Sequence, residues 1–352
     1  MRKYQLLTAT SMGVRITPAN HQPAGIGNLY TMTSTSAESN VLNVAASLGM
    51  RTKVLTRFVK DSPIATFIKG DLRRRNIEYE GPDIPQDGPW GCRHQFNIAD
   101  TGYGMRGPRV YNDRAGEVGR GIRASDFDLK RIFEDEGVEI IHMSGLFAAM
   151  SPETGDTCLK LSEIARANGA RISFDLNYRA SFWKGREAEL RRVFSEIAAR
   201  ADILIGNEED FQLALGIPGP KAGGEGLAGK IESFKEMILR VQGEYPNAAA
   251  FATTLREVVN ANQHNWGAIL RMDGAWHVAE PRPIFVLDRI GGGDGFVSGL
   301  LYGILKGWSP EDCLHFGWAS GAMAVTMIED FATPVDEDQV WNVWKGNARV
   351  KR

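Results

Sequence analysis

The chain has 352 residues, of which 43% are hydrophobic and 24% charged, and its formal net charge is −2. This composition is typical of a globular protein with one large core, and it offers no broad basic field to a nucleic-acid partner. Cys92, Cys158 and Cys313 are odd in number and far apart, so neither a disulfide framework nor a zinc site is expected. No apolar run approaches bilayer length, which predicts a cytoplasmic protein without a membrane partner.

The first 76 residues contain short strands and two helices. Three segments have the short apolar runs that are typical of strands: residues 5–10, 14–16 and 53–58. Residues 39–49 carry apolar side chains at helical spacing and end at a glycine, which often follows a helix. A second helix is predicted from Pro63, which follows the capping residue Ser62, to near Arg75.

Residues 77–121 differ in character from the segments on either side. They are rich in glycine and proline and lack the pattern of a long helix. Two candidate strands lie within them, at residues 92–99 and 109–112. We interpret the segment as a small β lid, to which residues 11–34 could contribute, over an α/β core made of residues 1–76 and 122–352. An ordinary surface excursion is the alternative, although its length disfavours a plain loop.

From Asp126 onward, predicted strands and helices alternate. The strands are residues 138–143, 171–175 and 203–206, and the helices are residues 151–168 and 185–199. This order predicts a doubly wound, mainly parallel sheet with helices on both faces. Ligands of such sheets bind beyond the carboxyl ends of the strands. Two polar clusters follow strands in this way, at residues 175–179 and 207–210.

The last part of the chain mixes strands and helices. We predict a helix at residues 233–245, a strand at 248–254, a hairpin of 266–272 and 275–278, and helices that begin near Ser309 and Asp336. Residues 255–265, between the strand and the hairpin, are expected to form a loop.

A glycine run followed by an acidic residue lies at the start of a predicted helix at residues 293–305. Gly291, Gly292 and Gly293 come first, and Asp294 follows them. The first turn of a helix has unpaired N–H groups and a positive dipole end, so this turn is suited to an anion such as phosphate. A carboxylate beside a bound anion is unfavourable unless it accepts a proton in the reaction, which suggests Asp294 as a general base. A helix cap is the alternative.

The pattern Asp288-x-x-Gly291-x-Gly293-Asp294-x-Phe296 resembles the D-T-x-G-A-G-D-x-F signature of the ribokinase-like (PfkB) carbohydrate kinases. The agreement extends over nearly the whole chain, and the two polar clusters most resemble the 2-keto-3-deoxygluconate kinase branch. The resemblance implies an ATP-dependent kinase that uses Mg²⁺ and converts 2-keto-3-deoxygluconate to 2-keto-3-deoxy-6-phosphogluconate. The alternatives are a fructokinase, another ketose or keto-acid kinase, or a catalytically weakened sugar-binding sensor.

The resemblance implies substrate contacts from several parts of the chain. The candidate residues are Thr35, Ser36, Asn40, Asn112, Arg114, Arg179 and Asp330. Thr35 and Ser36 replace two glycines that the family brings against the sugar, so the space for the substrate is altered. Arg114 keeps the arginine of the family's lid motif Tyr-x-Arg, with Asn112 in place of the tyrosine. Its paired donors match a carboxylate, which favours a sugar acid over a neutral sugar.

The resemblance also implies a nucleotide site and partners. The candidate nucleotide-binding residues are Asn177, Asn207, Arg256, Asp288 and Gly293. Asp294 would be the catalytic base, with Gly291, Gly292 and Gly293 as its anion hole. Asp210 stands where the family motif N-x-x-E has glutamate, and it is expected to hold magnesium through a water. The expected partners are a small sugar or sugar acid and further copies of the chain, in a homodimer or higher homo-oligomer formed through the lid.

Overall fold

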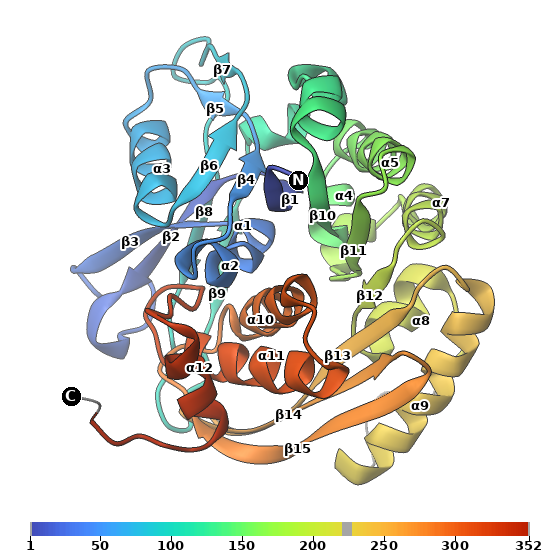
Figure 1. The fold of residues 1–352 in the computed structure, drawn as a ribbon. Coiled ribbons are helices and arrows are strands. Elements are labelled where there is room, and N and C mark those ends of the chain that lie inside the picture. Colours follow the sequence, from blue (N-terminus) through green and yellow to red (C-terminus); the bar gives the residue numbers. More distant parts are fainter. Residues whose placement is uncertain (1, 220–226, 351–352) are drawn as a thin grey trace.

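The computed structural model describes residues 2–219 and 227–350, and helices pack on both faces of a large central sheet (Figure 1). Its nine strands are β1 (Tyr4–Ala9), β4 (Thr52–Leu55), β6 (Ile77–Glu80), β10 (Val138–Ser144), β11 (Arg171–Asp175), β12 (Ile203–Ile205), β13 (Ala250–Asn260), β14 (Gln263–Met272) and β15 (Ala275–Phe285). Their order is β15-β14-β13-β12-β11-β10-β1-β4-β6. Every neighbouring pair from β13 to β6 is parallel, whereas β14 and β15 add by antiparallel pairing. The predicted doubly wound, mainly parallel sheet is confirmed.

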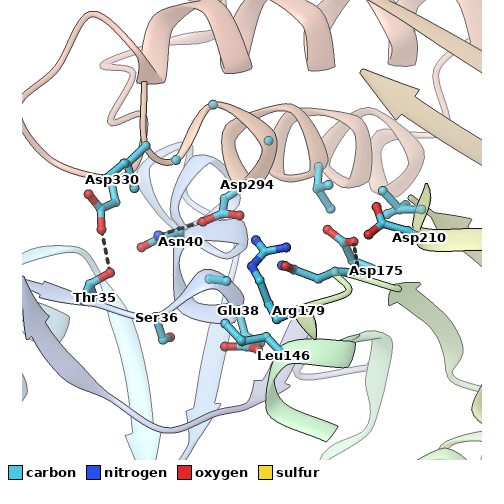
Figure 2. A pocket seen from close by; sticks show the side chains of 18 of the residues that line it. Thr35, Ser36, Glu38, Asn40, Leu146, Asp175, Arg179, Asp210, Asp294 and Asp330 are labelled. Atoms are coloured by element: carbon cyan, nitrogen blue, oxygen red, sulfur yellow. Dashed lines mark hydrogen bonds between the residues drawn. The ribbon is translucent and has the colours of Figure 1, made fainter. Parts of the chain in front are cut away.

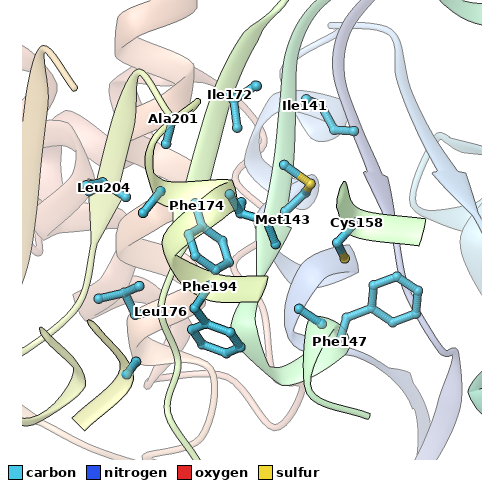
Figure 3. Close-up of a cluster of buried hydrophobic side chains, with 14 of the residues drawn as sticks. Ile141, Met143, Phe147, Cys158, Ile172, Phe174, Leu176, Phe194, Ala201 and Leu204 are labelled. Carbon is cyan, nitrogen blue, oxygen red and sulfur yellow. The ribbon is translucent and has the colours of Figure 1, made fainter. Parts of the chain in front are cut away.

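Two hydrophobic cores lie on opposite faces of this sheet because consecutive strand residues point in opposite directions. Leu7 and Ile141 belong to one core, and their neighbours Leu6 and Ile140 belong to the other. The first core, part of which Figure 3 shows, is covered by α4 (Gly145–Ala148), α5 (Pro152–Ala167), α7 (Glu187–Ala198), α8 (Glu208–Leu215) and α9 (Leu227–Glu244). The second is covered by α1 (Ala37–Val41), α2 (Asn43–Ser47), α3 (Pro63–Arg74), α10 (Gly292–Lys306), α11 (Pro310–Ala324) and α12 (Glu337–Trp344).

A separate small sheet lies beside the central one, as the predicted β lid required. Its strands are β2 (Gly13–Pro18), β3 (Tyr30–Thr35), β8 (Phe96–Ala99) and β9 (Val110–Asp113), in the order β3-β2-β8-β9. Half of this sheet therefore comes from the N-terminal segment. Strand β3 was not predicted, because three of its residues are exposed and it has no apolar run.

Two predicted boundaries near the lid need correction. Residues 77–80 were assigned to the lid, but they form β6 at the edge of the central sheet, where they pair with β4. The expected loop at residues 255–265 is instead the continuation of β13 and the start of β14. Its strand pattern was hidden because the outer half of β13 is largely exposed and carries no buried apolar run.

The remaining elements are short. They are the strands β5 (Phe58–Val59) and β7 (Asp83–Ile84), which pair with each other, the helix α6 (Ala180–Trp183), three 3₁₀ segments (Ala19–His21, Val118–Gly121 and Ala124–Asp126) and a π-helical turn (Arg131–Glu136). Within the described ranges, no helix is long and apolar enough to cross a membrane.

Candidate active site

A cavity of about 1010 Å³ opens between the small sheet and the carboxyl ends of the central strands. It is lined by side chains of the small sheet, by the segments that follow β11 and β12, and by the first turn of α10. All candidate residues from the sequence line this cavity except Asp288. Segments more than 200 residues apart thus meet at one site, as Asn40 and Asp294 do.

The glycine turn has the geometry expected of an anion-binding helix start. Gly291 precedes α10 in the left-handed conformation (φ 83°), and a Cβ there would lie 1.8 Å from the Asp330 carbonyl oxygen. A Cβ on Gly293 would meet no atom within 4 Å. Gly291 is therefore required by the backbone, whereas Gly293 leaves open space at the start of the helix. The free N–H groups of that first turn can bind an anion.

Asp294 lies in the same turn, and Figure 2 shows its side chain next to that of Asn40 at the edge of the cavity. The Asn40 Nδ2 donates to Asp294 Oδ2 over 2.9 Å, while the buried Asn40 Oδ1 has no partner among the described residues. Burial raises the pKa of Asp294 to about 7, against the hydrogen bond from Asn40, and the charges of Asp330 and Glu38 act in the same upward direction. A carboxylate with such a pKa is suited to accept a proton near neutral pH.

Glu38 is a cavity residue that the sequence analysis did not select. It is 1% exposed, and its carboxylate accepts hydrogen bonds from Thr10 Oγ1 at 2.5 Å and from Ser144 Oγ. It lies in the first turn of α1, and the available signal was its place between the selected residues Ser36 and Asn40. Its charge contributes to the raised pKa of Asp294.

Asp330 and Thr35 are joined by a hydrogen bond of 2.6 Å, and both line the cavity (Figure 2). Arg15, which the sequence analysis missed, pairs through Nη1 with Asp330 and through Nη2 with Asp288. Asp288 is 0% exposed and does not line the cavity. In this structure Asp288 pairs with Arg15 away from the cavity, and its predicted nucleotide contact stays a prediction. The sequence around Asp288 gave no indication that it pairs with Arg15, which is 273 residues away in the chain.

The small sheet supplies a polar wall that was only partly predicted. Asn97 and Asn112 are register partners on β8 and β9, and Gln95 precedes β8. The side-chain oxygens of Gln95 and Asn97 are buried without a hydrogen-bond partner among the described residues. Arg114 Nη1 pairs with Glu117 at 2.8 Å, and its guanidinium lies 5.6 Å from the Phe182 ring centre. Unsatisfied amide oxygens beside a cationic side chain suit a ligand that carries both hydroxyls and a negative charge.

The opposite wall holds the two polar clusters at the strand ends. Asn207 caps α8, and both Asp210 oxygens accept backbone N–H groups, from Asn207 at 2.8 Å and Tyr178 at 3.0 Å. Asn177 adopts a positive φ of 37°, and its Oδ1 is buried without a partner among the described residues. Burial, with the nearby charges of Asp210 and Asp294, raises the pKa of Asp175 well above its usual value. The described ranges contain no cluster of three acidic, histidine or cysteine side chains that could hold a metal ion.

A model of the pfkB family carbohydrate kinases matches residues 126–330. The chain belongs to this family. In its signature, Gly291, Gly293 and Asp294 are retained, while Gly292 stands in the place of alanine and Arg289 in the place of threonine.

Several relatives of this chain are named as sugar-acid kinases. The 5-dehydro-2-deoxygluconokinase of Clostridium perfringens is 32% identical over 207 residues, which are 58% of this chain and 55% of the relative. The chain thus matches about half the length of that relative. The 2-dehydro-3-deoxygalactonokinase of Haloferax volcanii is 26% identical over 347 residues, or 97% of each chain. The crystal structure of the Thermotoga maritima 2-dehydro-3-deoxygluconokinase has a TM-score of 0.87 at 26% identity and covers 98% of this chain and 99% of that one.

Arg289, which departs from the pfkB signature, lines the cavity together with Arg256. Both arginines lie near the glycine turn. Neither of them forms an ion pair among the described residues. Desolvation of the Arg256 guanidinium by the surrounding protein lowers its pKa to about 10, and the charge of Arg289 contributes to that shift. Burial, with a smaller contribution from the charges of Arg256 and Arg289, lowers the pKa of His264 to about 4. Two unpaired cations in one pocket favour a ligand with several negative charges.

Proposed function

We propose that this pfkB family protein transfers the γ-phosphoryl group of ATP to a hydroxyl of a keto-deoxy sugar acid. The first candidate is 2-keto-3-deoxygluconate, which would become 2-keto-3-deoxy-6-phosphogluconate. The observation that carries the proposal is the cavity itself, in which Asp294 and the glycine turn face the polar wall of the small sheet and Arg114. The names of the three relatives, each a kinase of a dehydro-deoxy sugar acid, support the same class.

The proposed mechanism assigns the proton transfer to Asp294. A substrate hydroxyl next to Asp294 loses its proton to the carboxylate as its oxygen attacks the γ-phosphorus, and ADP leaves in line. Asn40, which already bonds Asp294, would orient the carboxylate toward that hydroxyl. The N–H groups of the turn at Gly291, Gly292 and Gly293 would stabilise the charge on the transferred phosphoryl oxygens. Arg179, whose guanidinium lies between Asp294 and Asp175 in Figure 2, is placed to neutralise further charge.

The donor set at the strand ends fits Mg²⁺ only through water. Both oxygens of Asp210 already accept backbone N–H groups, so a direct bond to a metal is not expected. Magnesium usually keeps several waters and touches few carboxylates, which agrees with the predicted water-mediated role of Asp210 and Asn207. When bound with the nucleotide, the ion would neutralise phosphate charge. Asn177, Arg256 and Arg289 would contact the polyphosphate from the protein side.

A phosphorylation screen tests the proposed function directly. ADP formation would be measured with 2-keto-3-deoxygluconate, 2-keto-3-deoxygalactonate, 5-keto-2-deoxygluconate, fructose and ribose at equal concentrations. We expect kcat/KM for at least one acid to exceed that for either neutral sugar by about tenfold or more, the value of one charge-assisted contact. A preference for fructose would replace the sugar acid by the alternative ketose. No turnover of any substrate, with sugar binding retained, would favour the sensor.

Arg114→Ala should impair acidic substrates selectively. Glu117 occupies only Nη1 in the described contacts, so Nε and Nη2 are available to a substrate carboxylate. Loss of that contact should lower kcat/KM for a keto acid by about 10- to 100-fold, with little change for any neutral sugar. Arg109→Ala, at an exposed arginine of the same segment that does not line the cavity, is the matched control. An equal loss of kcat/KM for acids and for neutral sugars would show that Arg114 does not bind a substrate carboxylate.

The proposed homo-oligomer through the lid is supported by exposed apolar side chains on and beside the small sheet. Ile26, Leu29 and Tyr111 are 74%, 65% and 54% exposed. They come from two places, the segment between β2 and β3 and strand β9, and each could take part in a contact between copies of the chain. Light scattering should give at least twice the mass of one chain, and Tyr111→Glu should reduce that mass. If the wild type is monomeric at the concentrations used in the assays, the proposed homo-oligomer is wrong.

A further inference from the structure

Arg15 connects the small sheet to the glycine turn through buried charges. It lies on β2 and is 1% exposed. Its Nη1 pairs with Asp330 and its Nη2 with Asp288, while its Nε has no hydrogen-bond partner among the described residues. A single guanidinium can hold two carboxylates in a fixed relative position because its donors lie in one rigid plane.

The two carboxylates belong to the two walls of the turn. On one side, Asp288 precedes Gly291 closely in the chain, and its Oδ1 accepts the Ile290 N–H at 3.1 Å. On the other side, the backbone oxygen of Asp330 lies so close to Gly291 that a Cβ there would be 1.8 Å away. A movement of either wall would therefore move the glycine turn itself.

This arrangement is costly if it serves stability alone. One arginine faces two aspartates, and a buried ionic group is often no more stable than an apolar replacement of the same volume. Arg75, a second buried arginine, offers a comparison: it is 4% exposed, bonds Asn43 Oδ1 at 2.8 Å and the Ser39 carbonyl at 2.9 Å, and does not line the cavity. Arg75 also lies 3.9 Å from Asp71 and 3.7 Å from the centre of the Phe331 ring, but it forms no hydrogen bond with Asp288 or Asp330. Arg15 differs from Arg75 in that its hydrogen-bond partners are these two aspartates, which flank the turn.

We propose that Arg15 is a positioning residue that ties the small sheet to the glycine turn, so that the placement of the sheet over the substrate sets the geometry of phosphoryl transfer. The inference rests on the proposed function for its kinetic consequences. Arg15 holds Asp288 and Asp330 in place, and these two residues fix the position of the glycine turn next to the reacting atoms. The small sheet is then part of the catalytic apparatus as well as a cover.

The test compares Arg15→Lys with Arg75→Lys. A lysine keeps the charge but cannot bridge two carboxylates with planar paired donors. We expect Arg15→Lys to lower kcat by about 10- to 100-fold, because small displacements at a reacting centre have effects of this size. The KM for the sugar and the KM for ATP should both stay within about threefold of wild type. Arg75→Lys should keep kcat within about twofold even where its Tm falls. A similar kcat for Arg15→Lys and Arg75→Lys, or a loss confined to KM, would overturn the proposal.

A second measurement does not depend on knowing the substrate. Amide hydrogen exchange over residues 288–294 should become faster in Arg15→Lys and stay at the wild-type rate in Arg75→Lys, because only the former loosens the turn. The variant Arg15→Met/Asp288→Asn/Asp330→Asn, which removes all three charges, serves if Arg15→Lys does not fold, and it should show the same faster exchange. Unchanged exchange over these residues would refute the role of Arg15 even if the wild type phosphorylates none of the sugars in the screen.

Discussion

Asp294→Asn is expected to lower kcat by about 10²- to 10⁴-fold, while the Kd of the sugar changes by no more than about threefold. Asparagine keeps the shape of the side chain and can still bond Asn40, but it cannot accept the proton of the attacking hydroxyl. Turnover by ADP release and sugar binding by calorimetry measure the two effects separately. Asn40→Ala is a useful companion, because it removes the 2.9 Å hydrogen bond and leaves the base in place. Turnover of Asp294→Asn near the wild-type level would end the assignment.

The pH profile adds an independent check on the same residue. The pKa of Asp294 is raised to about 7, so the carboxylate is largely protonated and inactive as a base below that value. Activity of the wild type should therefore decrease as the pH falls through about 7, and the residual activity of Asp294→Asn should lack this acidic limb. An acidic limb that persists in the variant would assign the titration to another group.

Gly293→Val is expected to lower kcat by about 10²- to 10³-fold, the usual effect of losing anion stabilisation. A Cβ at Gly293 meets no protein atom within 4 Å, so the fold should accept the substitution and the new side chain should fill the space of the anion. Tm measured by calorimetry should stay within about 3 °C of wild type, as for surface changes that touch no packed group.

The neighbouring glycines serve as contrasts. Gly291→Ala places a Cβ 1.8 Å from the Asp330 carbonyl at a positive φ, so it should reduce stability and activity together. Gly292 is less informative, because its Cβ would contact Val325 Cγ1 at 2.8 Å and would mix a packing effect with the anion effect. If Gly293→Val lost Tm as Gly291→Ala does, or retained full turnover, the anion-hole role of the turn would be rejected.

Local patterns in the sequence were sufficient for the sheet and for the glycine turn. Alternating strands and helices after Asp126 need only neighbouring residues to be recognised, and the turn carries its own signal in Gly291 and Asp294. Strand β3 and the outer half of β13 gave no such signal, because their exposed faces lack apolar runs. Both became strands through pairing with distant partners, which a local pattern does not contain.

The sequence did not predict those contacts of the site in which a residue pairs with another that is distant in the chain. Asp288 was selected from the signature alone, and its pairing with Arg15, 273 residues away, was not anticipated. Glu38 acquires its place behind Asp294 through Ser144, 106 residues away. Long-range contacts of this kind follow from how distant segments of the chain pack together, and a local sequence pattern does not reveal them.

The unpaired cations Arg256 and Arg289 bear on the end of the catalytic cycle as well as on its beginning. Because they belong to the protein, they remain in the pocket after transfer and continue to attract the diphosphate of the product. If the two arginines bind the nucleotide as proposed, the departure of ADP would be slower than phosphoryl transfer. Added salt, which screens such attraction, would in that case accelerate the enzyme at saturating substrate and slow it at low nucleotide concentration.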